Sequence, residues 1–575
     1  MSKKSYLLTP TLAKNKSTNA STKVDKKTWH NLQGSSASIA LYQGALLSDV
    51  PILLLTHDTP TALKLEQELL SLSQSKDELP ICLFPDWETL PYDTFSPHQD
   101  IISQRLATLY QLSRMEKGIV IVPVTTLAQR LAPKQYIEAN SLVIKKGDKK
   151  DLHQLRQELE ASGYRCVDQV MEHGEFSARG AILDLFPMGS NTPFRLDFFD
   201  DEIDEIRLFD PENQRSNEKV DNINLLPAHE FPTDKDAISL FRSQYRELFN
   251  SSIDKESIYH QVSNGILPPG IEYYLPLFFQ NKNTDNSNDA ELSTNTLCDY
   301  LAPDTLVAIS GDLDKSLQQY WQDIEYRYEN RRYDPTRPLL PPEQLFLSKD
   351  ALYSALKPFA RITIKSCDEE TQLINESDSD NQTKQKSSAI YFDVNALPDL
   401  TIDHKLKQPF ELINNFIADK ETPNKTLFIA ESQGRRESVL ELLARDNIKP
   451  SLFGSIEDFI ESDEKLGISV NALNQGFTFQ AKSSAKKNAI ALITEAELLG
   501  DHVRQSRRRN KSQDIETDAI FKNLAELSIG QAVVHIEHGI GRYLGLQTLE
   551  TGGITTEFLM LSYANDAKLY VPVAS

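Results

Sequence analysis

Short apolar runs alternate with amphipathic stretches in the first part of the chain. Residues 51–56 and 118–123 are almost wholly apolar, which is typical of strands buried on both faces. After the first run, Asp58 or Thr59 can cap a helix that has Pro60 in its first turn. Strands that alternate with helices predict a parallel sheet over residues 28–131. The apolar face of the predicted helix consists of Leu63, Leu65, Leu69 and Leu70.

The period of the pattern changes over residues 132–212. Phe194, Leu196 and Phe198 alternate with Arg195 and Asp197, so apolar and charged side chains should lie on opposite faces of a strand. An acidic turn at residues 200–202 then reverses the chain. This pattern predicts an antiparallel sheet with one buried and one solvated face.

The remaining pattern predicts three further units. Residues 213–335 return to mixed α/β, with helices near 234–250 and 312–330. Residues 345–500 form another α/β unit, with a strand at 426–430 and a helix at 434–445. Residues 521–575 alternate short β-rich runs with glycine turns, as a small barrel does. The predicted fold class is therefore multidomain, with both α/β and α+β parts.

Polar stretches separate these units. The first 27 residues are rich in Ser, Thr and Lys, and we expect a disordered arm, with DNA contact as the alternative. Residues 281–296 and 368–388 have few apolar positions, which predicts a flexible insertion and a disordered segment. Residues 501–520 form a basic linker that is either solvated or a DNA-facing strap.

Composition narrows the class of protein. The chain of 575 residues carries 61 basic and 83 acidic side chains, a net charge of −22, so its surface as a whole does not suit DNA binding. Four scattered cysteines form no CxxC pair and predict neither a zinc site nor a disulfide framework. No apolar run approaches the roughly 20 residues of a membrane span. We expect a cytoplasmic monomer that makes no membrane contact.

Nucleotide hydrolysis requires a phosphate-binding loop, and the sequence contains no GxxxxGK[ST] motif. The best-placed candidate, residues 33–39, lacks the Gly-Lys-Ser/Thr ending and is interpreted as an ordinary turn. His535 and His538 form an HxxH pair without a nearby third ligand, which favours a structural role over a metal site. We therefore predict no catalytic, cofactor-binding or metal-binding residue.

Eight longer strings of the sequence carry more specific information. The strings are DWETLPYD (86–93), FSPHQD (95–100), EHGEFSARGAILDLFP (172–187), LDFFDDE (196–202), LPAHEFP (226–232), GIEYY (270–274), VVHIEHGIGRY (533–543) and YANDAKLYVP (563–572). They resemble one bacterial family, the transcription-repair coupling factors (Mfd). The resemblance runs from about residue 28 to residue 575, in the order of the family.

This resemblance implies a domain plan. Residues 28–131 and 213–335 would form a degenerate helicase-like (RecA-like) domain resembling UvrB, and residues 132–212 an inserted UvrA-binding domain. Residues 345–500 would be an α/β domain of unknown role. Residues 521–575 would be a CarD-like, SH3/Tudor-like barrel that binds the RNA polymerase β subunit. Family members carry two ATP- and Mg-dependent RecA-like motor domains after the barrel, which account for most DNA contact, and this sequence does not contain them.

The resemblance also assigns candidate contact residues. For UvrA it suggests Arg165, Arg179 and Phe186, since arginine binds carboxylates bidentately and an aromatic ring supplies contact area. The alternative is that Arg179 only shapes a hairpin and that Phe186 belongs to the core. For RNA polymerase it suggests residues 548–553 as the contact edge of the barrel, with Leu549 as an exposed anchor or, alternatively, a core residue. The polymerase-contact residues are Thr548, Leu549, Glu550 and Gly552.

The resemblance implies a role in transcription-coupled nucleotide-excision repair. We expect this chain to be an adaptor that binds UvrA and polymerase, and to bind UvrA without ATP or DNA. Two alternatives remain open. A stand-alone CarD-like transcription regulator would not need the UvrA-binding face. An active helicase or translocase would need the ATP site of a longer protein, so the sequence leaves enzymatic activity undecided.

Overall fold

The computed structural model describes most of the chain in separate ranges. The predicted basic linker at 501–520 lies outside the described residues, as do nearly all of the two polar segments predicted at 281–296 and 368–388. The described residues are 8, 12, 16–18, 21–23, 25–73, 79–249, 257–279, 294–365, 389–402, 408–418, 425–482, 487–499, 530–535, 539–551, 554–563 and 567–572.

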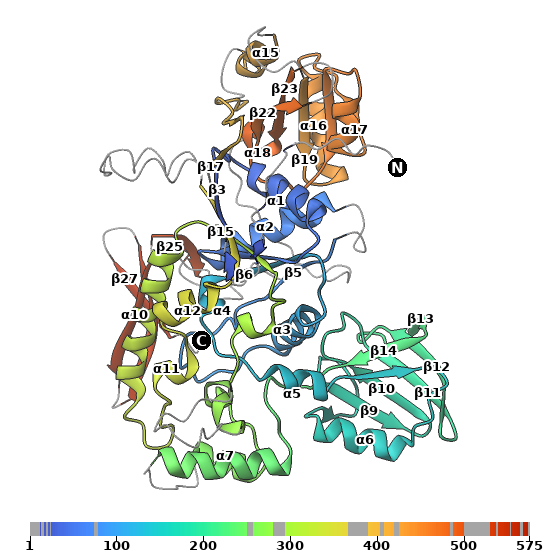
Figure 1. The fold of residues 1–575 in the computed structure, drawn as a ribbon, viewed down its shortest axis with the longest axis vertical. Helices are drawn as coiled ribbons and strands as arrows, with labels where there is room; N and C mark the ends of the chain where they lie inside the picture. Colours follow the sequence, from blue (N-terminus) through green and yellow to red (C-terminus); the bar gives the residue numbers. More distant parts are fainter. Residues whose placement is uncertain are drawn as a thin grey trace.

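A seven-stranded parallel sheet forms the middle of the molecule (Figure 1). Its strands, in spatial order, are β17 (Ala389–Tyr391), β3 (Lys26–His30), β16 (Ala360–Ile364), β15 (Leu306–Ser310), β4 (Ile52–Thr56), β6 (Ile119–Pro123) and β5 (Ile81–Leu83). Alternate residues of one strand enter two different cores. Leu53 and Leu55 of β4 face one apolar cluster and Ile52 and Leu54 the other, which explains the continuous apolar runs.

Helices cover both faces of this sheet. Asp58 caps the second helix, because its carboxylate accepts a hydrogen bond from the N–H of Thr61 at 2.8 Å, as the sequence predicted. The helices are α1 (Ser36–Leu47), α2 (Thr59–Leu72), α3 (Gln99–Leu112), α4 (Val124–Leu127), α5 (Lys134–Ala139), α10 (Leu313–Arg331), α11 (Pro342–Leu345) and α12 (Lys349–Leu356).

Two boundaries of this first unit were predicted wrongly. The segment with α12, β16 and β17 was assigned to the 345–500 unit, but its strands pair with β3 and β15 of the first sheet. The N-terminal arm was expected to be disordered, but β1 (Lys16–Thr18) and β2 (Ser21–Lys23) form an antiparallel pair. Leu8 is also buried, and its N–H donates to Gln43 at 2.7 Å.

An antiparallel unit is inserted between β6 and β15 (Figure 1, lower right). Its six-stranded sheet has the order β13 (Ser216–Val220), β12 (Glu202–Phe209), β11 (Phe194–Phe199), β10 (Ile182–Phe186), β9 (Glu175–Arg179), β8 (Arg165–Cys166). A separate pair joins β7 (Leu142–Lys145) to β14 (Asn222–Leu225), and α6 (Leu152–Ala161) precedes β8. The predicted boundary at residue 212 is thus too early, because β13 and β14 follow it.

Short helices lead from this insertion back to the parallel sheet. They are α7 (Lys235–Leu248), α8 (Ile258–Ser263), the 3-10 helix η1 (Ile271–Phe278) and α9 (Leu297–Tyr300). The predicted helices near 234–250 and 312–330 correspond to α7 and α10, and each begins after a capping aspartate, Asp234 or Asp312. Aromatic rings of α7 and η1, including Phe241 and Phe278, pack 4.9 Å apart and join these segments to the main core.

A second α/β unit lies at the top of Figure 1. Its six-stranded sheet has the order β18 (Val394–Asn395), β22 (Phe477–Lys482), β23 (Lys487–Thr494), β19 (Lys425–Ala430), β21 (Leu466–Val470), β20 (Ser451–Leu452). Its helices are α15 (Glu411–Ala418), α16 (Gln433–Ala444), α17 (Ile456–Glu461) and α18 (Glu495–Leu499). Strands β23, β19, β21 and β20 are parallel, whereas β18 and β22 add antiparallel.

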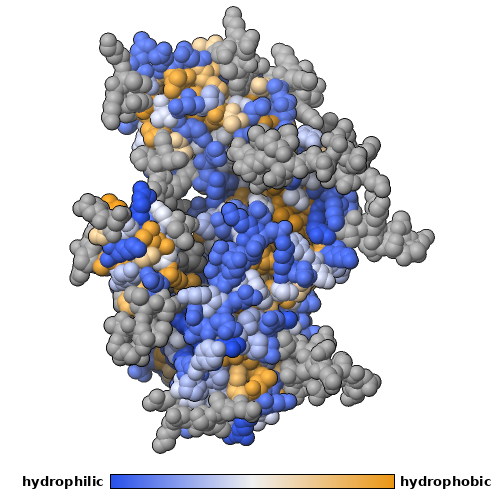
Figure 2. Space-filling model, turned by 90° about the vertical axis from the view of Figure 1, so that its left-hand side faces the viewer, coloured by the Kyte–Doolittle hydropathy of each residue, from blue (hydrophilic) through white to orange (hydrophobic). Residues whose placement is uncertain are grey.

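The C-terminal residues form a four-stranded antiparallel meander of β24 (Ala532–His535), β25 (Gly539–Thr551), β26 (Ile554–Ser562) and β27 (Lys568–Pro572). Val533, Tyr543 and Leu561 form its small core. A barrel was predicted, and in the described strands β24 and β27 are the two edges of a sheet. Figure 2 shows one side of the whole molecule, on which hydrophilic side chains dominate the middle and hydrophobic areas are separate.

Candidate interaction surfaces

The six-stranded sheet is antiparallel except for the parallel pair of β8 and β9. One of its faces carries charged side chains, and the other face packs into the main core. The strand register places Arg179 opposite Ile182, and Asp184 opposite Arg195, on the charged face. Phe176, Leu183 and Leu196 point the other way and are fully buried. The alternation of Arg195 and Asp197 with apolar neighbours therefore predicted this face correctly.

Arg165 lies exposed at the edge of this face, on β8. Its Nη2 donates to Glu175 Oε1 at 2.5 Å and lies 3.6 Å from Glu172 Oε2. Burial raises the pKa of the Glu175 carboxyl, but hydrogen bonds from the N–H groups of Met171 and Glu172 and from Arg165 lower that pKa overall. Glu175 thus holds one side of the Arg165 guanidinium, and the side chain remains 65% exposed for a partner.

Arg179 lies at the opposite end of β9, where the chain turns into β10. Gly180 lies in the two-residue turn between Arg179 and Ile182 and has φ +61°. This left-handed backbone conformation favours glycine. The exposed Arg179 side chain reaches back over the sheet, and its Nη2 donates to the carbonyl oxygen of Asp168. Arg165 and Arg179 therefore each form a hydrogen bond to another residue of the 165–179 segment, Arg165 to Glu175 and Arg179 to Asp168.

Phe186 does not form part of the exposed surface, which corrects its prediction as an aromatic anchor. It is only 7% exposed and packs with Val170 and Phe209. Its ring also lies 4.0 Å from the ring of His173. Phe186 is on the charged face by register, opposite Glu175, but the segment that follows β8 covers it. The alternative of a core role is the one that the burial supports.

The predicted polymerase-contact residues lie near the end of a β-hairpin. Thr548, Leu549 and Glu550 are in β25, opposite Glu557, Thr556 and Thr555 of β26. Their side chains and Gly552 lie outside the described residues. In the described part of the sheet, β24 pairs with β25 only up to Arg542, so residues 545–551 are paired on one side alone. This leaves a backbone edge that another strand could extend.

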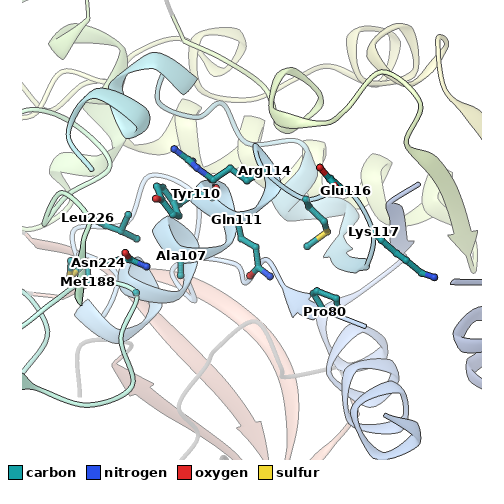
Figure 3. Close-up of a pocket in the computed structure, with 12 residues that line it drawn as sticks. Pro80, Ala107, Tyr110, Gln111, Arg114, Glu116, Lys117, Met188, Asn224 and Leu226 are labelled. Atoms are coloured by element: carbon teal, nitrogen blue, oxygen red, sulfur yellow. Dashed lines mark hydrogen bonds between the residues drawn. The ribbon is translucent and has the colours of Figure 1, made fainter. Parts of the chain in front are cut away.

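A separate cavity of about 650 Å³ opens between α3 and the antiparallel unit (Figure 3). Tyr110 of α3 and Arg114, which follows this helix, border it on one side, with the guanidinium 3.8 Å from the centre of the tyrosine ring. Met188 and Leu226 border it on the side of the antiparallel unit. In the described part of the chain no three metal-ligating side chains gather anywhere, and no helix is both long and apolar enough to cross a membrane.

Three family models match parts of the chain. Residues 142–231 match the UvrB interaction domain, residues 416–498 the MFD D3 domain, and residues 527–575 the CarD-like/TRCF RID domain. The transcription-repair-coupling factor of Escherichia coli (strain K12) is 48% identical over 91% of this chain and 42% of that protein. The chain belongs to the transcription-repair-coupling factor family.

Other coupling factors agree with this assignment. The protein of Haemophilus influenzae is 46% identical over 96% of this chain and 45% of its own length. That of Bacillus subtilis is 27% identical over 94% and 44%. The chain therefore spans less than half the length of the curated coupling factors that it matches. The UvrB interaction match ends at residue 231, which agrees with β13 and β14 belonging to the antiparallel unit.

Within this coupling-factor chain, the sequence reasoning missed a set of ion pairs on the charged face. Arg195 donates to both carboxylate oxygens of Asp184, at 2.6 and 2.8 Å. Arg207 pairs with Asp197 and, at 3.2 Å, with Glu205. The alternating strand pattern could have revealed them, because these residues fall at every second position. In these ion pairs the charged side chains of β10 to β12 bind one another, whereas Arg165 and Arg179 lie at the margin of the charged face.

Proposed function

We propose that this chain is an adaptor in transcription-coupled nucleotide-excision repair, which binds UvrA and RNA polymerase at separate surfaces. The family matches to a UvrB interaction domain and to a CarD-like/TRCF RID domain in one chain carry this proposal. A stand-alone CarD-like regulator would need only the second of these. The proposed cellular setting is the cytoplasm.

The UvrA contact is assigned to the margin of the charged sheet face. Arg165 remains 65% exposed although Glu175 fixes one of its nitrogens. Arg179 is exposed and fixed by a single carbonyl. A guanidinium that is positioned but still solvent-accessible loses little conformational entropy when it binds a carboxylate of a partner. We propose these two arginines, and not Phe186, as direct contacts.

The polymerase contact is assigned to the free edge of β25. We propose that the β subunit adds a strand beside residues 545–551, with Leu549 as an apolar anchor between polar neighbours. Displacement of polymerase by ATP-dependent translocation on DNA, with Mg as a cofactor, is proposed only for whole proteins of the family. This chain contains no GxxxxGK[ST] motif.

The test is a binding assay with the purified chain and single variants. Arg179→Ala should weaken UvrA binding by about tenfold, the usual loss for one exposed charged contact of moderate strength, and leave polymerase binding intact. Leu549→Arg should abolish polymerase binding and leave UvrA binding intact. Arg156→Ala, at an exposed position of α6, is the matched control and should change neither. Loss of both partners in either variant, or of neither, would contradict the two-surface proposal.

A further inference from the structure

The loop that opens α1 is covered by a segment of the second α/β unit. This loop follows β3 in the first parallel sheet, and the covering residues 471–476 follow β21 in the second. The N–H of Ser35 donates to the carbonyl oxygen of Gln475 at 3.0 Å, and the N–H of Gln475 donates to the Ser35 hydroxyl at 3.0 Å. Residues more than four hundred positions apart thus form a reciprocal pair.

Glu68 of α2 lies at the centre of this contact and is 1% exposed. Its Oε1 accepts hydrogen bonds from the Ser35 hydroxyl at 2.7 Å and from Asn474 Nδ2 at 2.8 Å. The Asn474 N–H also points to Oε1, at 3.1 Å, and the Ser38 hydroxyl donates to Oε2. Four donors from two units therefore converge on one carboxylate.

This carboxyl group is buried among hydrogen-bond donors. In the described part of the chain, no lysine or arginine nitrogen lies within 4.0 Å of it. A buried carboxylate is costly unless hydrogen bonds and local dipoles compensate its charge. The first turn of α1 contains no acidic residue of its own, and Ser35 does not cap it. The Glu68 carboxyl group instead accepts hydrogen bonds from the hydroxyls of Ser35 and Ser38 at the start of α1.

The backbones also approach closely around Glu68. A Cβ atom on Gly34 would lie 2.8 Å from the carbonyl oxygen of Gly476, so a larger residue would push the two segments apart. At the far end of α2, the Ser71 hydroxyl donates to Asn471 Oδ1 at 2.6 Å. On its own unit, Gly476 N–H donates to Glu497 at 2.7 Å, which holds the segment in place.

We propose that these contacts, which are centred on Glu68, form a polar lock. The lock fixes the orientation in which the second α/β unit packs on the first. Apolar side chains from both units, including Leu32 and Leu473, belong to one continuous cluster and supply the adhesion. Apolar adhesion is not directional, whereas four hydrogen bonds to one carboxylate permit a single arrangement. The two units then move as one body. The loop before α1 is covered by residues 471–476 of the same chain.

Hydrogen exchange measured by mass spectrometry on the full chain tests the lock. In Glu68→Ala, peptides covering residues 33–40 and 471–477 should exchange about tenfold faster or more, because several buried donors lose their acceptor. Asn474→Ala, made on the other unit, should accelerate the same two peptides. Glu66→Ala is the matched control, since a residue two positions earlier on α2 faces away from Glu68.

Two results would overturn the proposal. One is unchanged exchange of 471–477 in Glu68→Ala. The other is accelerated exchange throughout β4 and β15, which would make Glu68 a general core residue of the first unit. The double variant adds a further criterion: if both residues act in one lock, its acceleration should be well below the product of the two single effects. Effects that multiply fully would mean two independent contacts and would also reject the lock.

Discussion

At the scale of single residues, buried charge is concentrated where the 84–93 segment meets the rest of the first unit. Arg105 is fully buried, and its Nε donates to Glu230 Oε1 at 2.6 Å. Its guanidinium also lies 4.4 Å from the ring centre of Phe84. Trp87 Nε1 donates to the same Glu230 at 3.2 Å. Removing one partner of such a pair leaves an uncompensated charge, so these residues hold the segment in one conformation.

Glu272 is a buried carboxyl that forms no ion pair with another described residue, and it makes the stability of the protein depend on pH. Burial raises its pKa to about 7, an effect that the nearby Glu230 reinforces and the Ser96 hydroxyl, 2.8 Å away, opposes. In the unfolded chain the pKa is near 4.5. Between these values the folded state binds more protons, so the contribution of Glu272 to stability is present below pH 4.5 and is lost as pH rises through 7.

Glu272→Gln should remove this dependence, because the amide mimics the protonated carboxyl. At pH 5 the variant and the parent should unfold at similar temperatures. At pH 8 the variant should be more stable by on the order of 3 kcal/mol, a rise in Tm of about 5 °C, measured by calorimetry. Burial lowers the pKa of His229 to about 4, so this residue changes stability with pH in the opposite direction to Glu272. His229 is present in both proteins, and its contribution therefore cancels in the comparison. The exposed Glu247→Gln is the control, and an equal shift at both pH values would contradict this interpretation.

At the scale of elements, local sequence patterns correctly predicted strands whose burial pattern is repeated along the strand itself. The apolar runs at 51–56 and 118–123 became β4 and β6 because both faces of these strands are buried. The alternation around Leu196 became β11 for the equally local reason that one of its faces is solvated.

Local patterns could not predict which distant segments pair with each other. Arg361 of β16 lies beside Lys26 of β3, and no local feature of either strand specifies a partner so far away. The candidate site shows the same limit. The family resemblance suggested Phe186 as a contact beside Arg165 and Arg179, and the register places it on the charged face. Only the path of residues 167–172 over that face determines that the ring is buried.

The β9–β10 hairpin offers a test at this scale. Gly180 has φ +61°, and a Cβ atom added there would have no neighbour within 4 Å. Gly180→Ala should therefore destabilise the antiparallel unit through backbone strain alone, by about 1 kcal/mol. Calorimetry should show a lower Tm. Gly434→Ala, in the first turn of α16 and equally open, should be neutral or stabilising. Equal effects of the two substitutions would argue against a conformational role for Gly180.

At the scale of the whole molecule, the two proposed partner surfaces belong to units with separate cores. Arg165 and Arg179 lie on the antiparallel sheet, whose buried face joins the main core. The β25 edge belongs to a sheet whose core of Val533, Tyr543 and Leu561 forms a cluster of its own. Two sites couple only if a shared element changes state between them. Among the described residues these two cores are separate clusters, so no shared apolar core links the two surfaces.

We therefore predict that UvrA and RNA polymerase bind this chain independently and simultaneously. Arg165 and Arg179 are already exposed, so UvrA should bind without nucleotide, DNA or polymerase. Its dissociation constant should change by less than about twofold when polymerase is saturating, since a coupling free energy near zero leaves affinity unchanged. Titration of labelled UvrA with and without polymerase measures this, with Arg179→Ala as the control for specific binding. A tenfold change in either direction would mean that the two surfaces communicate, through contacts between the units or between the partners themselves.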